Sequence, residues 1–295
     1  MPKRKRPQAS KLRNPELARS SPKLPPPWHS FVRLFHPFPS LVVTAVTVAM
    51  ALFADSSPAL SVVIPLAVGM LCYQFAIGVA NDLVDATDDA TAKPWKAIPR
   101  GLVSRRTALI LVAALSGGGL LATSALPVAA WLIGMAGLAC GLAYDVQLKR
   151  TRLSWLPFAI AFPLIPTWVF AALGRWDSLL WVAFPLGAIL GLALHLANQA
   201  PDIPRESHVR GLAHSLGTER AANLALGLVG LAGIMAFVVL LFARAGTQAI
   251  LTAGAVMLAG VLARRAVRIF GPDGLFGLLA STSAVLAILF VSAVG

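Results

Sequence analysis

The sequence predicts an all-α integral membrane protein that crosses the bilayer nine times. Of its 295 residues, 57% are hydrophobic and only 13% are charged, whereas a soluble domain carries about 25% charged residues. Apolar runs of about 17–22 residues recur along the chain, and each is long enough to cross a hydrocarbon core of about 30 Å as a helix. The runs lack the alternation of a membrane β-barrel, so helices are the expected spanning structure.

Residues 1–30 are predicted to form a disordered basic tail, separate from a membrane domain of residues 31–295. The tail is rich in proline, lacks hydrophobic periodicity and carries Lys3-Arg4-Lys5-Arg6 near its start. A segment of this composition cannot bury a core, and its positive charge suits the surface of an anionic membrane.

Nine apolar spans follow the tail in order. Small residues within them, such as Gly187 and Gly191, would let neighbouring helices pack closely. An odd number of spans places the two termini on opposite sides of the membrane. The approximate limits of the spans are 38–54, 59–80, 106–123, 127–144, 154–173, 178–198, 221–242, 246–263 and 275–294.

The distribution of charge predicts the orientation of these spans. The net charge is +13, and only two of the 25 Lys and Arg residues, Arg175 and Arg244, lie on the side opposite the tail. By the positive-inside rule, the N-terminus and the loops on its side are cytoplasmic and the C-terminus is on the opposite side. Because the basic residues follow the topology, no nucleic-acid partner is expected. The basic loops lie at about 81–105, 145–153, 199–220 and 264–274.

The most unusual stretch is Asn-Asp-Leu-Val-Asp-Ala-Thr-Asp-Asp at residues 81–89, directly after the second span. It holds four of the 12 acidic residues of the chain. On a helix, its asparagine and four aspartate side chains project within about 120° of one another. Like charges about 6 Å apart repel by roughly 2–3 kcal/mol per pair at an effective dielectric constant near 20. A bound cation would relieve this repulsion, whereas a solvated acidic helix end is the simpler interpretation.

Two further polar segments lie on the same predicted side. Tyr-Asp-Val-Gln-Leu-Lys-Arg at residues 144–150 ends the fourth span. Asn198, Asp202 and Glu206 follow the sixth span at intervals of four residues, although Pro201 and Pro204 make a regular helix unfavourable there. Basic residues also follow the first acidic cluster, at Lys93, Lys96 and Arg100.

Carboxylates interleaved with basic side chains at a membrane boundary indicate phosphate chemistry. Carboxylates suit Mg²⁺, which often shares its coordination sphere with substrate phosphates, and Lys and Arg bind the remaining phosphate oxygens. A diphosphate neutralised by Mg²⁺ is a good leaving group. Since the spans offer an apolar slot for a hydrocarbon, prenyl diphosphates are the expected substrates.

The chain resembles the UbiA-type intramembrane prenyltransferases over about residues 33–294. Their NDxxDxxxD motif is matched in full by Asn81, Asp82, Asp85 and Asp89. Their Tyr-plus-Lys motif is similar to Tyr144 and Lys149, and their second acidic motif matches Asp202, with Glu206 or Asn198 near its other positions. The sequence departs from the usual second motif at Gln199, where an Asp is common, and at Pro201 and Pro204.

The resemblance implies nine transmembrane helices around a central cavity that opens to the cytoplasmic side. It also implies Mg²⁺-assisted ionisation of an allylic diphosphate, followed by capture of the carbocation by an acceptor. The implied catalytic residues are Asp82, Asp85, Asp202, Lys149 and Tyr144. The implied metal ligands are Asp82, Asp85, Asp89, Asp202 and Glu206. The implied substrate-binding residues are Asn81, Lys93, Lys96, Arg100, Arg150 and Asn198.

The predicted function is therefore transfer of a prenyl group from a polyprenyl diphosphate to an aromatic or other lipid acceptor, as in quinone or lipid biosynthesis. Phosphoribosyl-type transfer to a polyprenyl phosphate on the same fold needs the same metal and phosphate site, so the motifs do not separate the two. A membrane transporter is the alternative from another class. Transporters usually place ionisable groups near mid-membrane, whereas both acidic clusters here lie at span ends.

Overall fold

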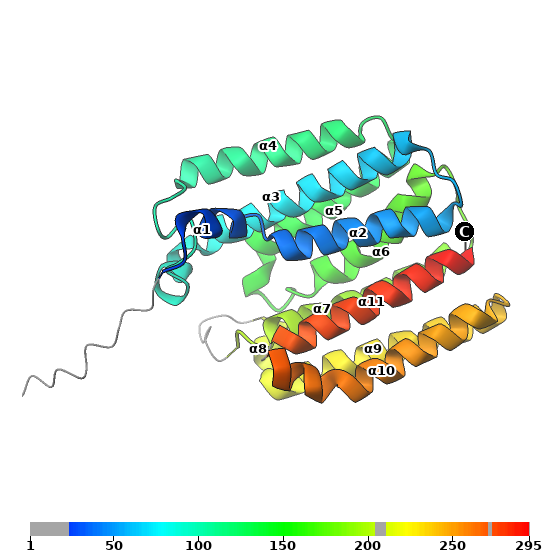
Figure 1. Ribbon diagram of the computed structural model, residues 1–295. Helices are drawn as coiled ribbons and strands as arrows, with labels where there is room; N and C mark the ends of the chain where they lie inside the picture. The colour runs from blue at the N-terminus through cyan, green and yellow to red at the C-terminus, as the bar shows by residue number, and fades with distance from the viewer. Residues whose placement is uncertain (1–23, 204–210, 271–272, 295) are drawn as a thin grey trace, which may run out of the picture.

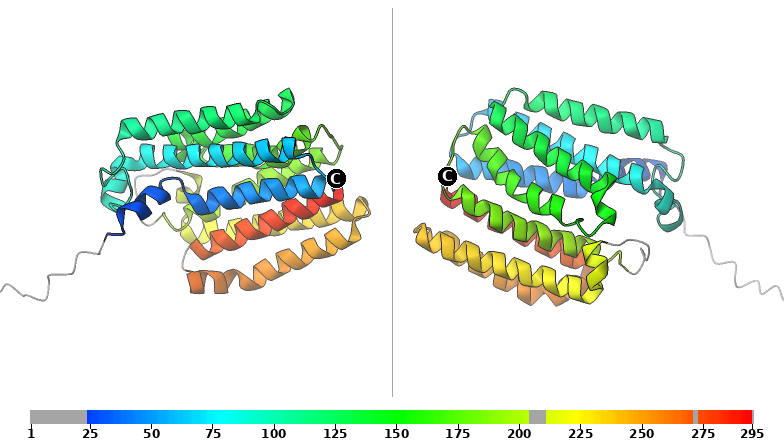
Figure 2. Two further views of the ribbon diagram at one scale, coloured as in Figure 1. Left: turned by 45° about the horizontal axis from the view of Figure 1, so that its top comes forward. Right: turned by 180° about the vertical axis from the view of Figure 1, so that it is seen from behind.

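The computed structural model describes residues 24–203, 211–270 and 273–294. These residues form no strand and contain nine long helices that run side by side (Figures 1 and 2). Three short helices accompany them: α1 (Pro27–Arg33), η2 (Leu148–Arg150) and α8 (Leu212–Leu216). The long helices are α2 (Pro37–Ala54), α3 (Leu60–Ala92), α4 (Arg105–Thr123), α5 (Val128–Val146), α6 (Leu156–Ala172), α7 (Leu180–Gln199), α9 (Thr218–Phe242), α10 (Gly246–Phe270) and α11 (Asp273–Val294).

Each predicted span corresponds to one long helix, which confirms an all-α integral membrane protein. Within the described part of the chain, eight helices are long and apolar enough to cross a membrane, α1 and α2 being counted together. The ninth, α6, has only 17 residues, about 26 Å at 1.5 Å per residue. Its proline at the first turn is compatible with a helix start, but Pro163 and Pro166 lie inside it.

Six of the helices form a closed ring. Around the ring, α2 contacts α3, α3 contacts α5, α5 contacts α6, α6 contacts α7, α7 contacts α11, and α11 contacts α2. Helix α4 covers α3 on the outside, while α9 and α10 cover α7 and α11. In this order α3, which carries the first acidic segment, and α7, which precedes the second, occupy opposite positions.

Glycines bring α6 and α7 into backbone contact. A Cβ atom built at Gly191 would lie 2.4 Å from the carbonyl oxygen of Phe158, and one at Gly187 would lie 2.7 Å from the backbone nitrogen of Pro163. No larger residue fits without a shift of backbone. The two helices therefore pack through small residues, as the sequence predicts.

Helix α3 is much longer than its apolar span. Its 33 residues measure about 50 Å at 1.5 Å per residue, against a hydrocarbon core of about 30 Å. The helix ends where Lys93 N bonds Asp89 O at 2.8 Å, directly before Pro94. The acidic stretch is consequently the last part of a continuous helix, not a loop after one.

The N-terminal segment is partly helical. Residues 1–23 of the predicted tail lie outside the described residues, but α1 begins at Pro27, with proline in the first turn. Ser30 in α1 donates a hydrogen bond to Trp95 O at 2.6 Å. This contact attaches α1 to the loop after α3.

Candidate functional site

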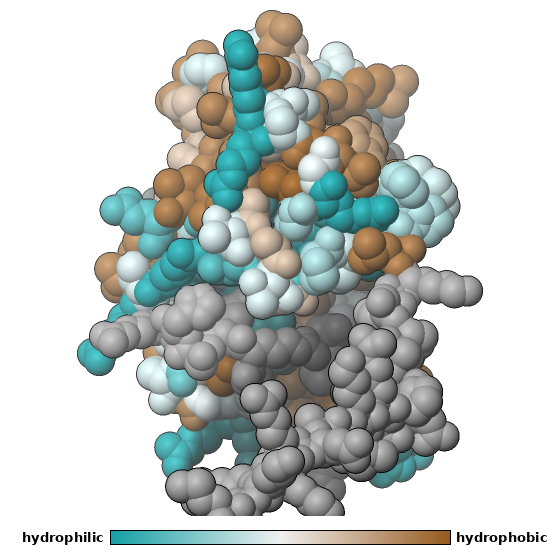
Figure 3. Space-filling view, turned by 90° about the vertical axis from the view of Figure 1, so that its left-hand side faces the viewer, coloured by the Kyte–Doolittle hydropathy of each residue, from teal (hydrophilic) through white to brown (hydrophobic). Residues whose placement is uncertain are grey.

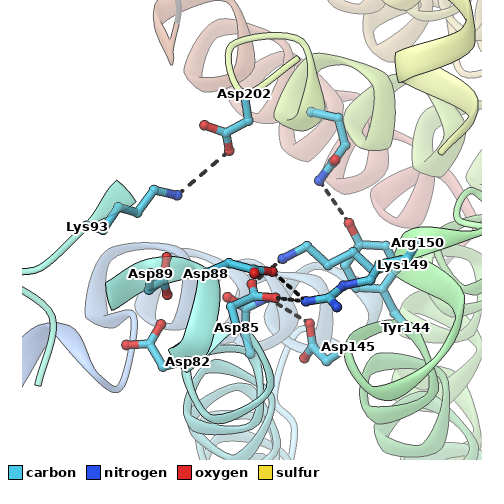
Figure 4. Close-up of polar contacts among 12 residues, drawn as sticks. Asp82, Asp85, Asp88, Asp89, Lys93, Tyr144, Asp145, Lys149, Arg150 and Asp202 are labelled. Carbon is cyan, nitrogen blue, oxygen red and sulfur yellow. Dashed lines mark hydrogen bonds and ion pairs between the residues drawn. The ribbon is translucent and has the colours of Figure 1, made fainter. Parts of the chain in front are cut away.

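The C-terminal ends of α3, α5 and α7 meet at one end of the bundle. The loops that follow these helices lie at the same end as α1, while α11 ends at the opposite end (Figure 1). Seen from that end, hydrophilic side chains gather on the molecular surface (Figure 3). Eight of the acidic and basic residues singled out in the sequence lie here: Asp82, Asp85, Asp88, Asp89, Lys93, Lys149, Arg150 and Asp202 (Figure 4).

Lys96 joins two buried carboxylates of α3. Its Nζ donates to Asp82 Oδ1 at 2.7 Å and to Asp89 Oδ2 at 2.6 Å, and Asp82 is only 2% exposed. Burial alone would lower the pKa of Lys96, but the charge of Asp82 and the hydrogen bonds to both carboxylates raise it above its ordinary value. The side chain is therefore an ammonium ion, placed between two carboxylates as a bound cation would be.

His36 contacts Asp82, and the sequence motifs predict no role for it. Its Nε2 lies 3.0 Å from Asp82 Oδ1, and its backbone is left-handed, with φ 47°, just before α2 begins at Pro37. Gly78, one helical turn before Asp82, permits this approach, since a Cβ there would lie 3.2 Å from the carbonyl group of Phe35. The role of His36 follows from a tertiary contact between the turn before α2 and helix α3, which the sequence of neither segment reveals by itself.

Residues of η2 pair with the more exposed face of the acidic stretch. Lys149 Nζ donates to Asp85 Oδ2, and Arg150 Nη2 donates to Asp88 Oδ2 at 2.8 Å. The same guanidinium lies 3.7 Å from Asp85 Oδ1. Both basic residues thus lie beside the carboxylates of α3.

The end of α5 makes two further polar contacts. Asn81 Nδ2 donates to Asp145 Oδ1 at 2.8 Å, and the hydroxyl of Tyr144 accepts a hydrogen bond from Gln199 Nε2 at 2.9 Å. Gln199 is buried. This residue stands where an Asp is common in the family, and it connects α7 to α5. The sequence assigned no site role to Asp145 or Gln199.

Asp202 lies across the site from the carboxylates of α3 and faces Lys93 (Figure 4). Its Oδ2 is 4.0 Å from Lys93 Nζ, so the turn after α7 and the loop after α3 are joined by an ion pair. Asn198, one turn earlier, is exposed. Glu206, the remaining residue predicted from this segment, lies outside the described residues.

Arg100 is not brought to the carboxylates. Its Nη1 donates to Pro25 O at 2.8 Å and to Ser30 Oγ at 2.9 Å. The direction of the Arg100 side chain follows from the loop. The next residue, Gly101, adopts a positive φ of 73° that turns the chain back toward α4. The structure gives Arg100 a part in attaching α1, and the substrate-binding role implied by the resemblance stays a prediction.

A cavity of about 260 Å³ opens beside Asp82 and Lys96. It lies between the turn from α1 to α2 and the loop after α3. Apart from these two charged residues, its walls are formed by Arg33, His36, Pro37, Phe38, Pro39 and Trp95.

The donor atoms of the site suit a hard cation that arrives with phosphate. Among the described residues, no three His, Cys, Asp or Glu side chains converge closely enough to hold a metal ion by themselves. The α3 carboxylates instead face Lys96, Lys149 and Arg150. Mg²⁺ commonly takes one or two carboxylates together with substrate phosphates. The oxygen-rich helix end therefore fits Mg²⁺ bound with a phosphorylated ligand.

Fold and site together define an intramembrane protein with an acidic and basic site at one end of its bundle. The chain belongs to the UbiA prenyltransferase family, whose sequence model matches residues 41–292. A comparison with curated proteins finds no match.

Solved structures share the fold at low sequence identity. A UbiA homologue from Archaeoglobus fulgidus bound to GPP and Mg²⁺ has a TM-score of 0.69 and 16% identity, covering 89% of this chain and 99% of that one. A UbiA homologue from Aeropyrum pernix K1, in its apo form, has a TM-score of 0.65 and 19% identity, covering 83% and 94%. A digeranylgeranylglyceryl phosphate synthase has a TM-score of 0.61 and 14% identity, covering 91% and 97%.

Proposed function

We propose that this protein transfers a prenyl group from a polyprenyl diphosphate to an aromatic or other lipid acceptor, with Mg²⁺ as its cofactor. The observation that carries the proposal is the pairing of the α3 carboxylates with Lys96, Lys149 and Arg150 at the end of an apolar bundle. Family membership supports the same activity, as does the A. fulgidus homologue with GPP and Mg²⁺.

In this proposal the metal is held by carboxylates of α3 and of the turn after α7. Asp82, Asp85 and Asp89 contribute from α3, and Asp202 contributes from the opposite side. When bound, Mg²⁺ supplies the positive charge that neutralises the departing diphosphate. Asn81 and Asn198 help to orient the metal-bound phosphates.

The basic residues bind and orient the diphosphate. Lys149 and Arg150 approach it from η2, and Lys93 and Lys96 from the loop after α3. As the C1–O bond of the allylic donor breaks, its electron pair leaves with the diphosphate, and the acceptor forms a new bond to C1 and releases a proton. Tyr144 either donates a hydrogen bond to phosphate or stabilises the allylic cation through its ring. The apolar helices hold the hydrocarbon chain.

The test is incubation of purified protein with Mg²⁺, prenyl diphosphates of graded length and a membrane lipid extract. Mass spectrometry should show an acceptor that gains a prenyl unit while pyrophosphate is released, and Asp82→Asn protein serves as the inactive control. If no prenyl diphosphate is consumed but a phosphoribosyl diphosphate is, the proposal is wrong and transfer to a polyprenyl phosphate replaces it.

A further inference from the structure

Asp145 is a buried acidic residue that the proposed reaction does not use. It projects from the end of α5 toward α3 (Figure 4) and is 4% exposed. Its Oδ1 accepts the hydrogen bond from Asn81. Its Oδ2 is buried and has no hydrogen-bond partner within the described parts of the chain.

The stability of the fold does not explain this carboxylate. A buried charged group with an unsatisfied oxygen costs free energy of folding, and an apolar residue of similar size would often be as stable or more so. The surrounding side chains are those of the candidate site, because Asn81, Lys149, Asp85 and His36 all interact with Asp145. A role in that site is the remaining explanation.

The contact determines how the amide of Asn81 is oriented. A carboxamide has a donor NH₂ group and an acceptor oxygen, whereas a carboxylate only accepts. In the structure the NH₂ group of Asn81 donates to Asp145, so its carbonyl oxygen is the amide atom that does not face this carboxylate. Asn81 shares a helix face with Asp82 and Asp85, whose oxygens are candidate metal ligands.

We propose that Asp145 is a positioning residue that fixes the amide of Asn81, so that the Asn81 carbonyl oxygen is presented to the cation held by the α3 carboxylates. This inference rests on the proposed function. Groups that orient a metal ligand in this way are worth about 10–100-fold in metal affinity. A neutral amide at position 145 accepts and donates equally well, so Asn81 would lose its single orientation.

The test measures Mn²⁺ binding to the full chain in detergent by electron paramagnetic resonance, with and without inorganic pyrophosphate. Asp145→Asn should bind Mn²⁺ about tenfold more weakly, while its melting temperature stays the same or rises. Asp177→Asn, a carboxylate at the opposite end of the molecule, should leave the affinity unchanged and serves as the matched control.

A double-mutant cycle separates positioning from a general effect of charge. If Asp145 acts through Asn81, then Asp145→Asn should cause no further loss of Mn²⁺ affinity in Asn81→Ala protein. Losses that multiply in the double variant would overturn the inference, as would unchanged affinity in Asp145→Asn alone. Failure of both Asp145→Asn and Asp145→Leu to fold would overturn it too, by assigning a structural role. If unaltered protein binds no Mn²⁺ under either condition, the proposed function fails along with it.

Discussion

The carboxylates at the end of α3 have basic counter-ions supplied by the protein itself. Lys96 bridges Asp82 and Asp89 and compensates negative charge that a bound metal ion would otherwise compensate. The pKa of Lys96 is raised in the fold, so the ion pairs of Lys96 stabilise the folded protein. This stabilisation is fully present below the unfolded pKa of Lys96, about 10.4, and is lost only as pH rises through the folded pKa. At neutral pH the ammonium therefore occupies one oxygen of each carboxylate, and in the proposed function a metal ion competes with it for these two side chains.

Lys96→Met should destabilise the metal-free protein and make it depend on metal. Removing one partner of a buried ion pair typically costs about 3–5 kcal/mol, because the remaining charge is uncompensated. We expect Mg²⁺ to raise the melting temperature of this variant more than that of the unaltered protein. Lys93→Met, which removes a longer and more exposed pair with Asp202, should cost less than about 1 kcal/mol. Destabilisation of Lys96→Met that Mg²⁺ does not relieve would contradict this account.

Asp82→Asn should reduce the rate of prenyl transfer by at least about a hundredfold, as expected for loss of a charge that acts on the transition state. The substitution keeps the shape of the side chain but removes the charge that faces Lys96 and His36. Asp88→Asn is the matched control, because Asp88 lies on the same helix with its side chain 43% exposed. We expect it to retain nearly full activity. Rates at saturating Mg²⁺, with melting temperatures as a folding check, distinguish the two.

Among the elements, the loop between α3 and α4 combines two roles. Lys96 turns toward the carboxylates, whereas Arg100 bonds α1. Arg100→Ala should therefore lower the free energy of unfolding by about 1–3 kcal/mol, the usual result of removing charge-assisted hydrogen bonds, without changing KM for the prenyl diphosphate. A large rise in KM with normal stability would instead restore the substrate-binding role that the sequence implied.

Two glycine substitutions should have opposite effects, because one glycine lies in the contact between α6 and α7 and the other lies outside it. Gly191→Ala should destabilise the protein, because its Cβ would meet the carbonyl oxygen of Phe158 at 2.4 Å. Gly117→Ala places its Cβ in open space within α4 and should be neutral or stabilising by up to about 1 kcal/mol, the helix propensity difference. Thermal unfolding in detergent measures both, and equal effects would show that backbone contact does not limit this interface.

Local features of the site could be predicted, and contacts between helices could not. The shared face of Asp82, Asp85 and Asp89 follows from helical periodicity, and the span limits follow from hydropathy. Which base meets which acid depends on how α3, α5 and the loops are rotated about their axes, and spacing does not encode this. For that reason the sequence does not identify the contact of Arg100 with α1, of His36 with Asp82 or of Asp145 with Asn81.

At the scale of the whole molecule, the charge distribution predicts that the end bearing the site faces the cytoplasm. With Cys72 and Cys140 replaced by alanine, a cysteine at exposed Arg106 should react with an impermeant maleimide only in inverted vesicles. A cysteine at exposed Ser56, at the other end, should react only in right-side-out vesicles. The reverse pattern would place the site outside and contradict the positive-inside assignment.

The closure of the helix ring by α11 against α2 sets an order of events during synthesis. Of the six ring helices, α2 leaves the ribosome first and α11 last, so the ring cannot close until α11 has been made. The pairs that link Asp82, Asp85 and Asp89 to Lys96 and Lys149 lie entirely within residues 82–149. The nascent first half can thus neutralise its own acidic groups at the bilayer surface before Asp202 has been translated.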